Sequence, residues 1–375
     1  MTRRTLVLII TAAVLAGCQT AKQAEAGGTG LEQIPVFISG EDGYHTYRIP
    51  AVIATQQGTL LAFCEGRKNS GSDHGDLDLV LKRSTDGGLT WGPMQLVYEE
   101  GGDAEITIGN PCPVVDQSNG RVWLPFCRDN DDVLVTWSDD DGKTWAKPVE
   151  ITGAVKPADW GWYATGPGVG IQLRHGGHAG RLVIPCDHRE KLDGKWVKKS
   201  HVFYSDDAGQ TWQLGEPVKL HTDECQVAEL AGGRLLINMR NYWEREGGQP
   251  EKGGMRAIAY SEDGGETWTD FGFDETLVEP VCQASLISYC PERPNMLLFS
   301  NPATKDKRIR MTVRLSRDGG KTWPAARLLF EGPSAYSCLV PLPDGEVGCL
   351  YECGPKKAYQ TITFARFSIP WLEGE

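Results

Sequence analysis

The sequence predicts an all-β fold, a six-bladed β-propeller in which each blade is a four-stranded antiparallel sheet. Two observations predict it: a short turn motif that occurs five times, and a pair of apolar strands that occurs six times among these motifs. Repeats of about 50–60 residues that are rich in short strands and turns, with little helical periodicity, are typical of propellers. A closed ring also leaves no sheet edge exposed.

The turn motif reads Ser-x-Asp-x-Gly-x-Thr-Trp, and an alternating or apolar segment precedes every copy. Its Asp can accept hydrogen bonds from the backbone of its own turn, and its Trp supplies an apolar group to bury. We therefore interpret each box as the hairpin turn between the third and fourth strands of a blade, with an Asp that stabilises the fold rather than performing chemistry. The five copies begin at Ser84, Ser138, Ser205, Ser261 and Ser316.

The second repeat consists of two apolar strands joined by a turn, which we assign to the first and second strands of each blade. The sixth unit has no box after its strands. We therefore expect residues 34–38 to supply its outer strand and close the ring. The turns that precede the six second strands contain Gly58, Gly120, Gly180, Gly233, Asn295 and Gly345.

The composition narrows the class of protein. The chain has 375 residues and a net charge of −12, from 38 basic and 50 acidic residues. It contains no basic run, so nucleic acid is not an expected partner. Hydrophobic residues make up 40% of the chain, which is enough for a sizeable core. We expect residues 31–375 to form one propeller domain and the protein to be a monomer.

The N-terminus reads as a targeting segment. In residues 1–17, Arg3 and Arg4 precede an apolar run that is too short to span a bilayer. The run ends in Leu-Ala-Gly before Cys18, which resembles a bacterial lipoprotein cleavage box and implies a lipid anchor on Cys18. Residues 18–30 then form a flexible tether. A plain secretory signal is the alternative. We expect an exported protein, anchored in the cell envelope (periplasm or outer membrane) or secreted, that meets a membrane only through this lipid.

Ten further cysteines lie mostly within apolar strand-like runs, where a free thiol packs as a small hydrophobic group. An exported protein could also pair some of them. Cysteines and histidines show no spacing typical of a metal site, and so we predict neither zinc nor a catalytic cysteine.

Hairpin geometry sorts the charged residues between the two rims of the ring. The start of each first strand, the end of each second strand and the loop that follows share one rim, and the boxes lie on the other. Arginines and carboxylates gather on the first rim, which suits an anionic ligand, although solvated rim charges are the alternative. This rim carries Arg48, Arg67, Asp73, Arg128, Arg189, Glu224, Arg240, Arg308, Tyr336 and Glu352.

The motif Tyr-Arg-Ile-Pro at residues 47–50, followed by several boxes, resembles the exo-α-sialidases (neuraminidases) of bacterial and animal type. The resemblance covers roughly residues 31–372. It implies release of terminal α-linked sialic acids from glycoproteins, glycolipids or oligosaccharides, without a metal or organic cofactor.

The resemblance implies a binding role for five residues. Arg48, Arg240 and Arg308 would form a triad that holds the substrate carboxylate with charge-assisted hydrogen bonds. Glu352 would brace the Arg48 guanidinium, and Arg67 would line the pocket near the ring hydroxyls of the sugar.

It also implies three catalytic residues. Tyr336 would be the nucleophile, because a neutral phenol avoids the repulsion that a carboxylate nucleophile would meet at a carbon bearing a carboxylate. Glu224 would accept the phenolic proton, since a free tyrosine has a pKa near 10. Asp73 would act as general acid and then general base, and the two displacements would retain the anomeric configuration.

Some assignments have competitors nearby in the chain. We prefer Arg308, Asp73 and Glu224 from their positions relative to the expected strands and boxes. The competitors are Arg310 for Arg308, Asp76 or Asp78 for Asp73, and Glu229 for Glu224. Candidates to line the rest of the pocket are Trp162, Tyr163, His188 and Asn301.

Two other functions fit part of the pattern. The arginines would recognise only the carboxylate, so a related nonulosonic acid such as the deaminated form is an alternative substrate. A propeller that binds sialylated glycans without cleaving them is an alternative class, but it would have no use for Tyr336, Glu224 and Asp73 together. The motifs are compatible with any linkage and with either hydrolysis or intramolecular transfer.

Overall fold

The structure is a computed structural model that describes residues 30–374. The predicted signal segment, Cys18 and most of the tether therefore lie outside the described residues. Between residues 30 and 374, no helix is long and apolar enough to cross a membrane.

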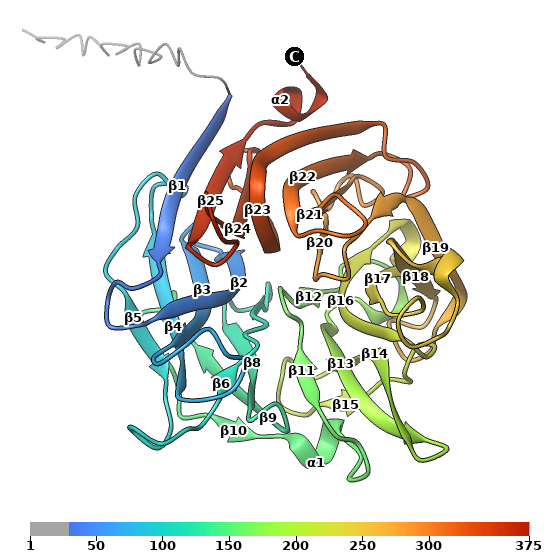
Figure 1. Cartoon of the computed structure of the whole chain (residues 1–375), viewed down its shortest axis with the longest axis horizontal. Helices are drawn as coiled ribbons and strands as arrows, with labels where there is room; N and C mark the ends of the chain where they lie inside the picture. Colours follow the sequence, from blue (N-terminus) through green and yellow to red (C-terminus); the bar gives the residue numbers. More distant parts are fainter. Residues whose placement is uncertain (1–29, 375) are drawn as a thin grey trace, which may run out of the picture.

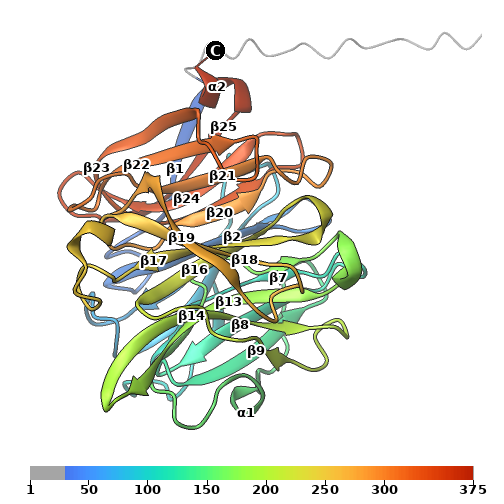
Figure 2. The same cartoon turned by 90° about the vertical axis from the view of Figure 1, so that its right-hand side faces the viewer.

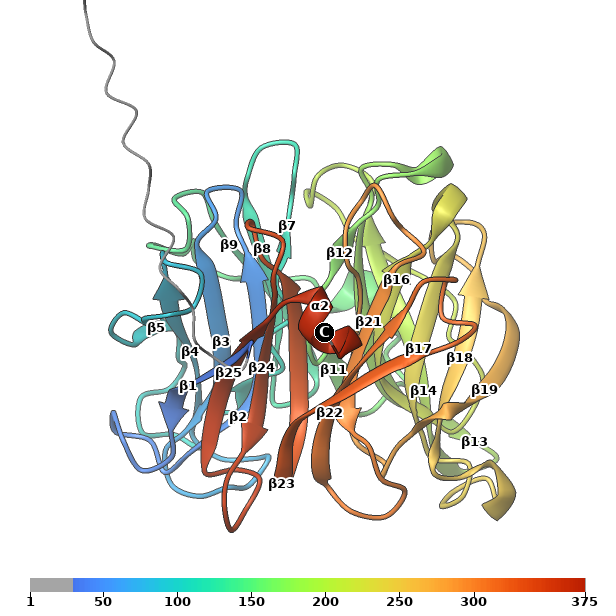
Figure 3. The ribbon, with the colours of Figure 1, turned by 90° about the horizontal axis from the view of Figure 1, so that it is seen from above.

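The described chain is all-β, with a propeller-like arrangement of antiparallel sheets around a common centre (Figure 1). Seen from its edge, the ring shows the sheets side by side, with their strands running between its two faces (Figures 2 and 3). Four small sheets contain four or five strands each, and a larger curled sheet contains seven.

The four small sheets follow one another along the chain. The first contains β2 (Thr46–Ala54), β3 (Leu60–Arg67), β4 (Leu77–Ser84) and β5 (Gln95–Tyr98). The second contains β6 (Ile108–Gly109), β7 (Val114–Val115), β8 (Val122–Arg128), β9 (Asp132–Ser138) and β10 (Val149–Glu150). The third contains β11 (Tyr163–Thr165), β12 (Ile171–Gln172), β13 (Leu182–Leu192), β14 (Lys195–Ser205) and β15 (Gln213–Leu214). The fourth contains β16 (Thr222–Glu229), β17 (Leu235–Asn241), β18 (Met255–Ser261) and β19 (Thr269–Val278).

The first strand of the second and third sheets is broken in two, where the sequence predicts one continuous strand. Pro111 and Pro113 separate β6 from β7, and Pro167 separates β11 from β12. Proline has no N–H to donate to a ladder, which accounts for both interruptions. Each pair of short strands still bonds to a single second strand, β8 or β13.

The seven-stranded sheet is held together by one long strand. The first part of β23 pairs with β22 and its second part pairs with β24. At the outer edge β1 pairs antiparallel with β25, as predicted for residues 34–38, so the two ends of the described chain lie side by side (Figure 1). The strands are β1 (Leu31–Ile38), β20 (Ser285–Ser288), β21 (Leu297–Pro302), β22 (Ile309–Ser316), β23 (Ala325–Pro341), β24 (Val347–Cys353) and β25 (Thr361–Phe367).

Helical structure is confined to short segments that join or end the strands. They are α1 (Thr152–Val155), η1 (Gly176–His178), η2 (Ala231–Gly233), η3 (Pro250–Lys252) and α2 (Ile369–Glu373).

The five boxes are hairpin turns with one shared hydrogen-bond pattern. In the second box, Thr144 donates its N–H and its hydroxyl to the Asp140 carboxylate, at 2.8 and 2.7 Å. The Ser138 hydroxyl donates to Asp140 and accepts from the Gly142 N–H, both at 2.9 Å. Burial raises the pKa of Asp140, but the hydrogen bonds from Thr144 outweigh it and lower that pKa to about 2. The prediction that these aspartates support the fold is confirmed.

The interior of the ring is packed with apolar strand residues, including most of the cysteines. Among the described residues the ten cysteines are free, and all except Cys290 are buried. Buried free thiols behave as small hydrophobic side chains, as the sequence predicts for most of them.

Candidate active site

The strand ends bring all eight predicted site residues to one mouth of the ring. Each lies on a strand that starts or ends at this mouth, on a loop that follows a second strand, or, for Tyr336, at the point where β23 passes from its partner β22 to its partner β24. The strand residues are Arg48 on β2, Arg67 on β3, Glu224 on β16, Arg240 on β17, Tyr336 on β23 and Glu352 on β24, and the loop residues are Asp73 and Arg308.

Tyr336 and Glu224 form the centre of the site. The Tyr336 hydroxyl donates a hydrogen bond to one oxygen of the Glu224 carboxylate. The other oxygen accepts from Arg240 Nη1 at 2.7 Å, and the same Nη1 lies 3.2 Å from the tyrosine hydroxyl. Burial, and then the charge of Glu224, raise the pKa of Tyr336 well above its ordinary value. The phenol is therefore neutral and already paired with a proton acceptor.

Glu352 fixes the position of the Arg48 guanidinium. Its fully buried carboxylate accepts from Arg48 Nε at 2.9 Å and from Arg48 Nη2 at 3.3 Å. The same carboxylate accepts the backbone N–H groups of Ile49 and Tyr336, each at 3.0 Å. Four donors from two strands satisfy this buried charge, and so they hold Arg48 beside the backbone of Tyr336.

Three guanidiniums surround the Tyr336 ring. The Cζ atoms of Arg48 and Arg308 lie 4.9 and 5.6 Å from the ring centroid, and Arg240 contacts the hydroxyl. Arg308 is held in place by hydrogen bonds to the Tyr359 hydroxyl at 3.0 Å and to a backbone carbonyl. Its competitor Arg310 is exposed and pairs with Glu331 away from this cluster, so the geometry favours Arg308.

Asp73 projects into the mouth from its loop, with a side chain that is 63% exposed. Its carboxylate accepts from Arg67 Nη1 at 2.8 Å and from Arg48 Nη1 at 3.4 Å. Burial raises the pKa of Asp73, but the charges of Arg67 and Arg48 outweigh it, and the pKa lies below its ordinary value. Asp73 is therefore ionised in this structure.

The two competing aspartates are engaged elsewhere. Asp76 is buried and forms an ion pair with Lys68 at 2.9 Å. Asp78 accepts a hydrogen bond from the Tyr44 hydroxyl at 2.6 Å and also pairs with Lys68. Neither carboxylate contacts the arginines at the mouth, so Asp73 is the aspartate in the site.

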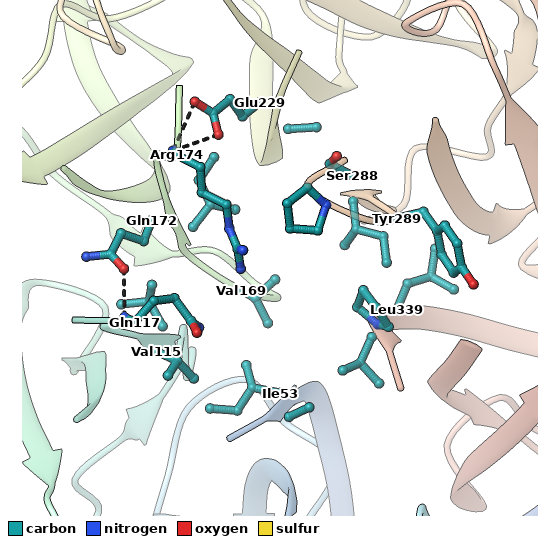
Figure 4. A pocket seen from close by; sticks show the side chains of 18 of the residues that line it. Ile53, Val115, Gln117, Val169, Gln172, Arg174, Glu229, Ser288, Tyr289 and Leu339 are labelled. Atoms are coloured by element: carbon teal, nitrogen blue, oxygen red, sulfur yellow. Dashed lines mark hydrogen bonds between the residues drawn. The ribbon is translucent and has the colours of Figure 1, made fainter. Parts of the chain in front are cut away.

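Glu229 lies at the opposite mouth of the ring, in a separate, mainly apolar cavity of about 380 Å³ (Figure 4). Its carboxylate accepts the backbone N–H groups of Arg174, at 2.9 and 3.1 Å, and of His175, at 2.8 Å. These bonds tie the end of β16 to the neighbouring sheet. Glu229 therefore has a structural role, and Glu224 is the carboxylate that meets Tyr336.

A cavity of about 180 Å³ opens at the mouth that holds Tyr336. Trp162 lines it, as predicted, but Tyr163, His188 and Asn301 do not. Alternation along the paired strands β11 and β13 explains two of these errors, since Tyr163 and His188 are directly opposed and both turn away from the cavity. There Tyr163 bonds to His201, and His188 stacks on Trp160.

Asn301 is the third error. Its side chain is buried and donates to the Val278 carbonyl at 2.7 Å. It therefore ties β21 to the fourth sheet instead of facing the cavity.

Sequence reasoning missed several residues that build this site. Glu65 is buried and pairs with Arg67 at 2.7 Å, so it fixes the arginine that holds Asp73. Tyr359 positions Arg308, but the loop that contains Tyr359 carries no sequence motif from which this role could be predicted. The remaining cavity residues that were not predicted are Ile49, Asn110, Asn130, Ala164, Asp187, Lys198, Asp223 and Tyr242.

Comparisons with known proteins agree with this architecture. The family model described as "BNR repeat-like domain" matches residues 58–349. The chain is 35% identical to a sialidase of Micromonospora viridifaciens, over 97% of this chain and 59% of that protein. It is 30% identical to an exo-alpha-sialidase of Arthroderma benhamiae, over 88% of this chain and 85% of that protein. Among solved structures, Hadza microbial sialidase Hz136 superposes with a TM-score of 0.80 at 34% identity, over 90% of this chain and 68% of that one.

The boxes, the ring of antiparallel sheets and the arginine-lined mouth define a β-propeller of the BNR-repeat class. Within this class, the chain belongs to the exo-α-sialidase family. It spans about three fifths of the length of its sialidase relatives from Micromonospora viridifaciens and Bacteroides fragilis.

Proposed function

We propose that this protein is an exo-α-sialidase that hydrolyses terminal α-linked sialic acids from glycoproteins, glycolipids or oligosaccharides, with retention of configuration. The observation that carries this proposal is the hydrogen bond from the Tyr336 hydroxyl to Glu224 within a ring of three guanidiniums. A buried phenol paired with a carboxylate is equipped to attack, and the arginines beside it are equipped to bind an acid.

The arginines have N–H groups that remain available to donate hydrogen bonds to a substrate carboxylate. Arg240 Nε is buried and has no hydrogen-bond acceptor within the described residues. Arg48 and Arg308 are each oriented by protein groups that leave their guanidiniums beside the Tyr336 ring. A planar carboxylate placed among them could accept hydrogen bonds from all three positively charged side chains at a partly desolvated site, which favours binding of an anionic sugar.

Tyr336 then serves as the nucleophile. Its oxygen attacks the anomeric carbon as Glu224 accepts the phenolic proton, and the bond to the departing sugar breaks. Water displaces the tyrosine oxygen in a second step, and the proton returns from Glu224 to the phenol. Two inversions give net retention, the outcome of glycosidases with a tyrosine nucleophile.

Asp73 supplies the acid of the first step and the base of the second. In this structure the charges of Arg67 and Arg48 keep its pKa low. A substrate carboxylate bound to Arg48 would offset part of this positive charge, so the pKa of Asp73 would rise when substrate binds. The acid would thus become competent in the complex, where a proton is required by the leaving oxygen.

We also propose that the ring has six blades. The support lies in the register of β23, which shifts between Ser334 and Ser337 after its pairing with β22 has ended. A division at this point splits the seven-stranded sheet into two four-stranded units, β20 to β23 and β23 to β1, that share one strand.

We further propose that the protein is exported and held in the cell envelope by a lipid on Cys18. The described chain enters β1 at Leu31, opposite Phe367, which in turn pairs with Val347 at the rim of the boxes. Leu31 therefore lies on the rim opposite the site, so the proposed tether would join the ring away from the pocket and leave the pocket accessible. Cys18→Ser should release active protein from the membrane fraction, and its retention there would argue against the lipid.

The decisive experiment is proton NMR of α2,3-, α2,6- and α2,8-linked sialosides during hydrolysis. We expect free sialic acid to appear first as the α-anomer and to mutarotate afterwards. First appearance of the β-anomer would contradict the retaining mechanism, and release of no sialic acid would contradict the proposed activity. A first-formed anhydro sugar would instead identify intramolecular transfer.

A further inference from the structure

The cavity beside Tyr336 contains a carboxyl group that no protein residue satisfies. Asp187 lies on β13, directly opposite Ala164 of β11, and both residues line the cavity. Only 2% of Asp187 is exposed. Its Oδ1 is buried without a hydrogen bond, and within residues 30–374 neither of its oxygens forms an ion pair or a hydrogen bond. A buried polar group without a hydrogen bond destabilises the fold, and such a group in a pocket indicates that a ligand supplies the missing hydrogen bond.

The surroundings of Asp187 oppose its ionisation. Burial, and then the carboxylates of Asp223 and Glu224, raise its pKa well above the ordinary value, while Arg240 and Lys198 lower it by less. Below this raised pKa the carboxyl is neutral and carries an O–H that can donate. The titratable groups that face it are Cys127 on β8, Tyr163 on β11, Lys198 on β14, Asp223, Glu224 and Cys225 on β16, and Arg240 on β17.

Asp187 stands across the mouth from most of the carboxylate-binding groups. The arginines come from the first, fourth and seven-stranded sheets, and Tyr336 also belongs to the last of these. Asp187 comes from the third sheet, beside Asn110 and Asn130 of the second in the cavity lining. A sugar whose carboxylate meets the arginines and whose anomeric carbon meets Tyr336 must direct its far substituents toward this side.

We propose that Asp187 is a specificity-determining residue that donates a hydrogen bond to an acceptor oxygen on the end of the sugar remote from its carboxylate. The acceptor is either the acyl carbonyl of the amino substituent or a hydroxyl of the ring or side chain. This inference rests on the proposed sialidase activity. It predicts that an anionic group placed at that end of the substrate is tolerated poorly once Asp187 ionises.

The test compares two variants with a matched control. Asp187→Leu has similar size and no donor, and we expect its KM to rise about 10-fold with kcat little changed, since it loses one hydrogen bond that forms before the reaction. Asp187→Asn keeps an N–H donor, so its KM should rise by only about 3-fold. Glu190→Gln changes a carboxylate three residues along β13 that pairs with Lys199 outside the cavity, so it should behave like the wild type.

The pH profile separates a donor from a merely structural group. The wild type should bind best below the raised pKa of Asp187 and lose affinity as the pH rises through it, because the O–H donor becomes a carboxylate. Asp187→Asn should lack this alkaline rise in KM. Three aryl sialosides identify the acceptor: one with an N-acetyl group, one with a hydroxyl in its place, and one with a shortened side chain. The difference in KM between the wild type and Asp187→Leu should vanish for the substrate that lacks the acceptor oxygen.

Equal KM values for the wild type and Asp187→Leu, or an unchanged alkaline limb in Asp187→Asn, would overturn the proposal. If the wild type hydrolyses none of these substrates, the proposed activity fails first. The inference is then decided by calorimetry with 2,3-didehydro-N-acetylneuraminic acid. A dissociation constant at least about 10-fold lower for the wild type than for Asp187→Leu supports the inference. Equal dissociation constants, or no binding by either protein, overturn it. A melting temperature no lower than that of the wild type shows that either variant is folded.

Discussion

The Tyr336 hydroxyl is the atom on which the proposed chemistry depends. We expect Tyr336→Phe to lower kcat by about 10³-fold or more, because the nucleophilic oxygen is removed, while binding of the sugar survives. Steady-state kinetics and calorimetry with a sialic acid analogue measure the two effects separately. The matched control is Tyr351→Phe, a buried tyrosine on the neighbouring strand whose hydroxyl bonds to Gln33 outside the site. Turnover at the wild-type rate by Tyr336→Phe would refute the assignment.

Asp73 leads to a prediction that depends on the leaving group. For sialyllactose, whose departing sugar needs a proton, Asp73→Asn should lower kcat/KM by about 10²–10⁴-fold. For an aryl sialoside with an acidic phenol, the loss should be far smaller, since the phenolate leaves unaided. Asp76→Asn, a change at the aspartate paired with Lys68, should show no such difference between substrates. Equal losses on both substrates would show that Asp73 is not the acid.

Single residues differ in how well the sequence predicts them. Arg48, Glu352 and Tyr336 follow from strand starts and ends, because hairpin geometry alone decides which rim a strand end reaches. Asp187 and Tyr359 could not be predicted in this way. The first depends on which face of β13 turns to the cavity, and the second on the path of a loop. Both are set by tertiary packing rather than by local pattern.

At the scale of one element, each box is a self-contained turn. In Asp140→Ala, the Thr144 N–H and hydroxyl and the Ser138 hydroxyl lose their acceptor. The turn is partly exposed, so water replaces some of these bonds, and we expect a loss of about 1–2 kcal/mol in unfolding free energy with kcat/KM unchanged. Asp139→Ala, next to it and paired only with Arg121 at the surface, should change stability by less than about 0.5 kcal/mol. Thermal melts and kinetics on both variants provide the comparison.

The same boxes connect stability to pH. The pKa of their aspartates is lowered in the fold, to about 2 for Asp86 and Asp140. A carboxylate with a lowered pKa stabilises the fold above the pKa of the unfolded chain, and this stabilisation is lost as the pH falls toward the folded value. Melting temperatures should therefore decline between about pH 5 and pH 2, and the decline should be shallower in Asp140→Ala. Identical slopes would mean that this box does not contribute.

The bounds of some strands could not be predicted from the sequence pattern. The alternating segments before the boxes predict the third strands well, since their apolar residues are simply buried. Continuous first strands were expected in the second and third sheets, but Pro111, Pro113 and Pro167 interrupt them. The 17-residue strand β23 was also not expected, because nothing in its sequence shows that one strand serves two pairings.

At the scale of the whole molecule, the first and last parts of the described chain depend on each other. Phe37 of β1 is fully buried, and its ring lies 5.3 Å from that of Tyr47 on β2. It therefore joins the outer strand of the seven-stranded sheet to the first sheet, the point at which the ring closes (Figure 1). Without this contact, β1 would be held mainly by its ladder to β25, and a lost β1 would leave an open sheet edge.

We expect Phe37→Ala to lower the unfolding free energy by about 3–4 kcal/mol, through lost burial and a cavity. Phe203→Ala removes an equally buried ring on β14, away from the closure, and should cost a similar amount. The two variants should differ in where they open. In Phe37→Ala the amides of β1 and β25 should exchange with solvent early and the protein should self-associate at the freed edge, whereas in Phe203→Ala these amides should stay protected. Hydrogen exchange with mass spectrometry resolves the two strands, and unchanged protection of β1 in Phe37→Ala would show that the ring closes without this side chain.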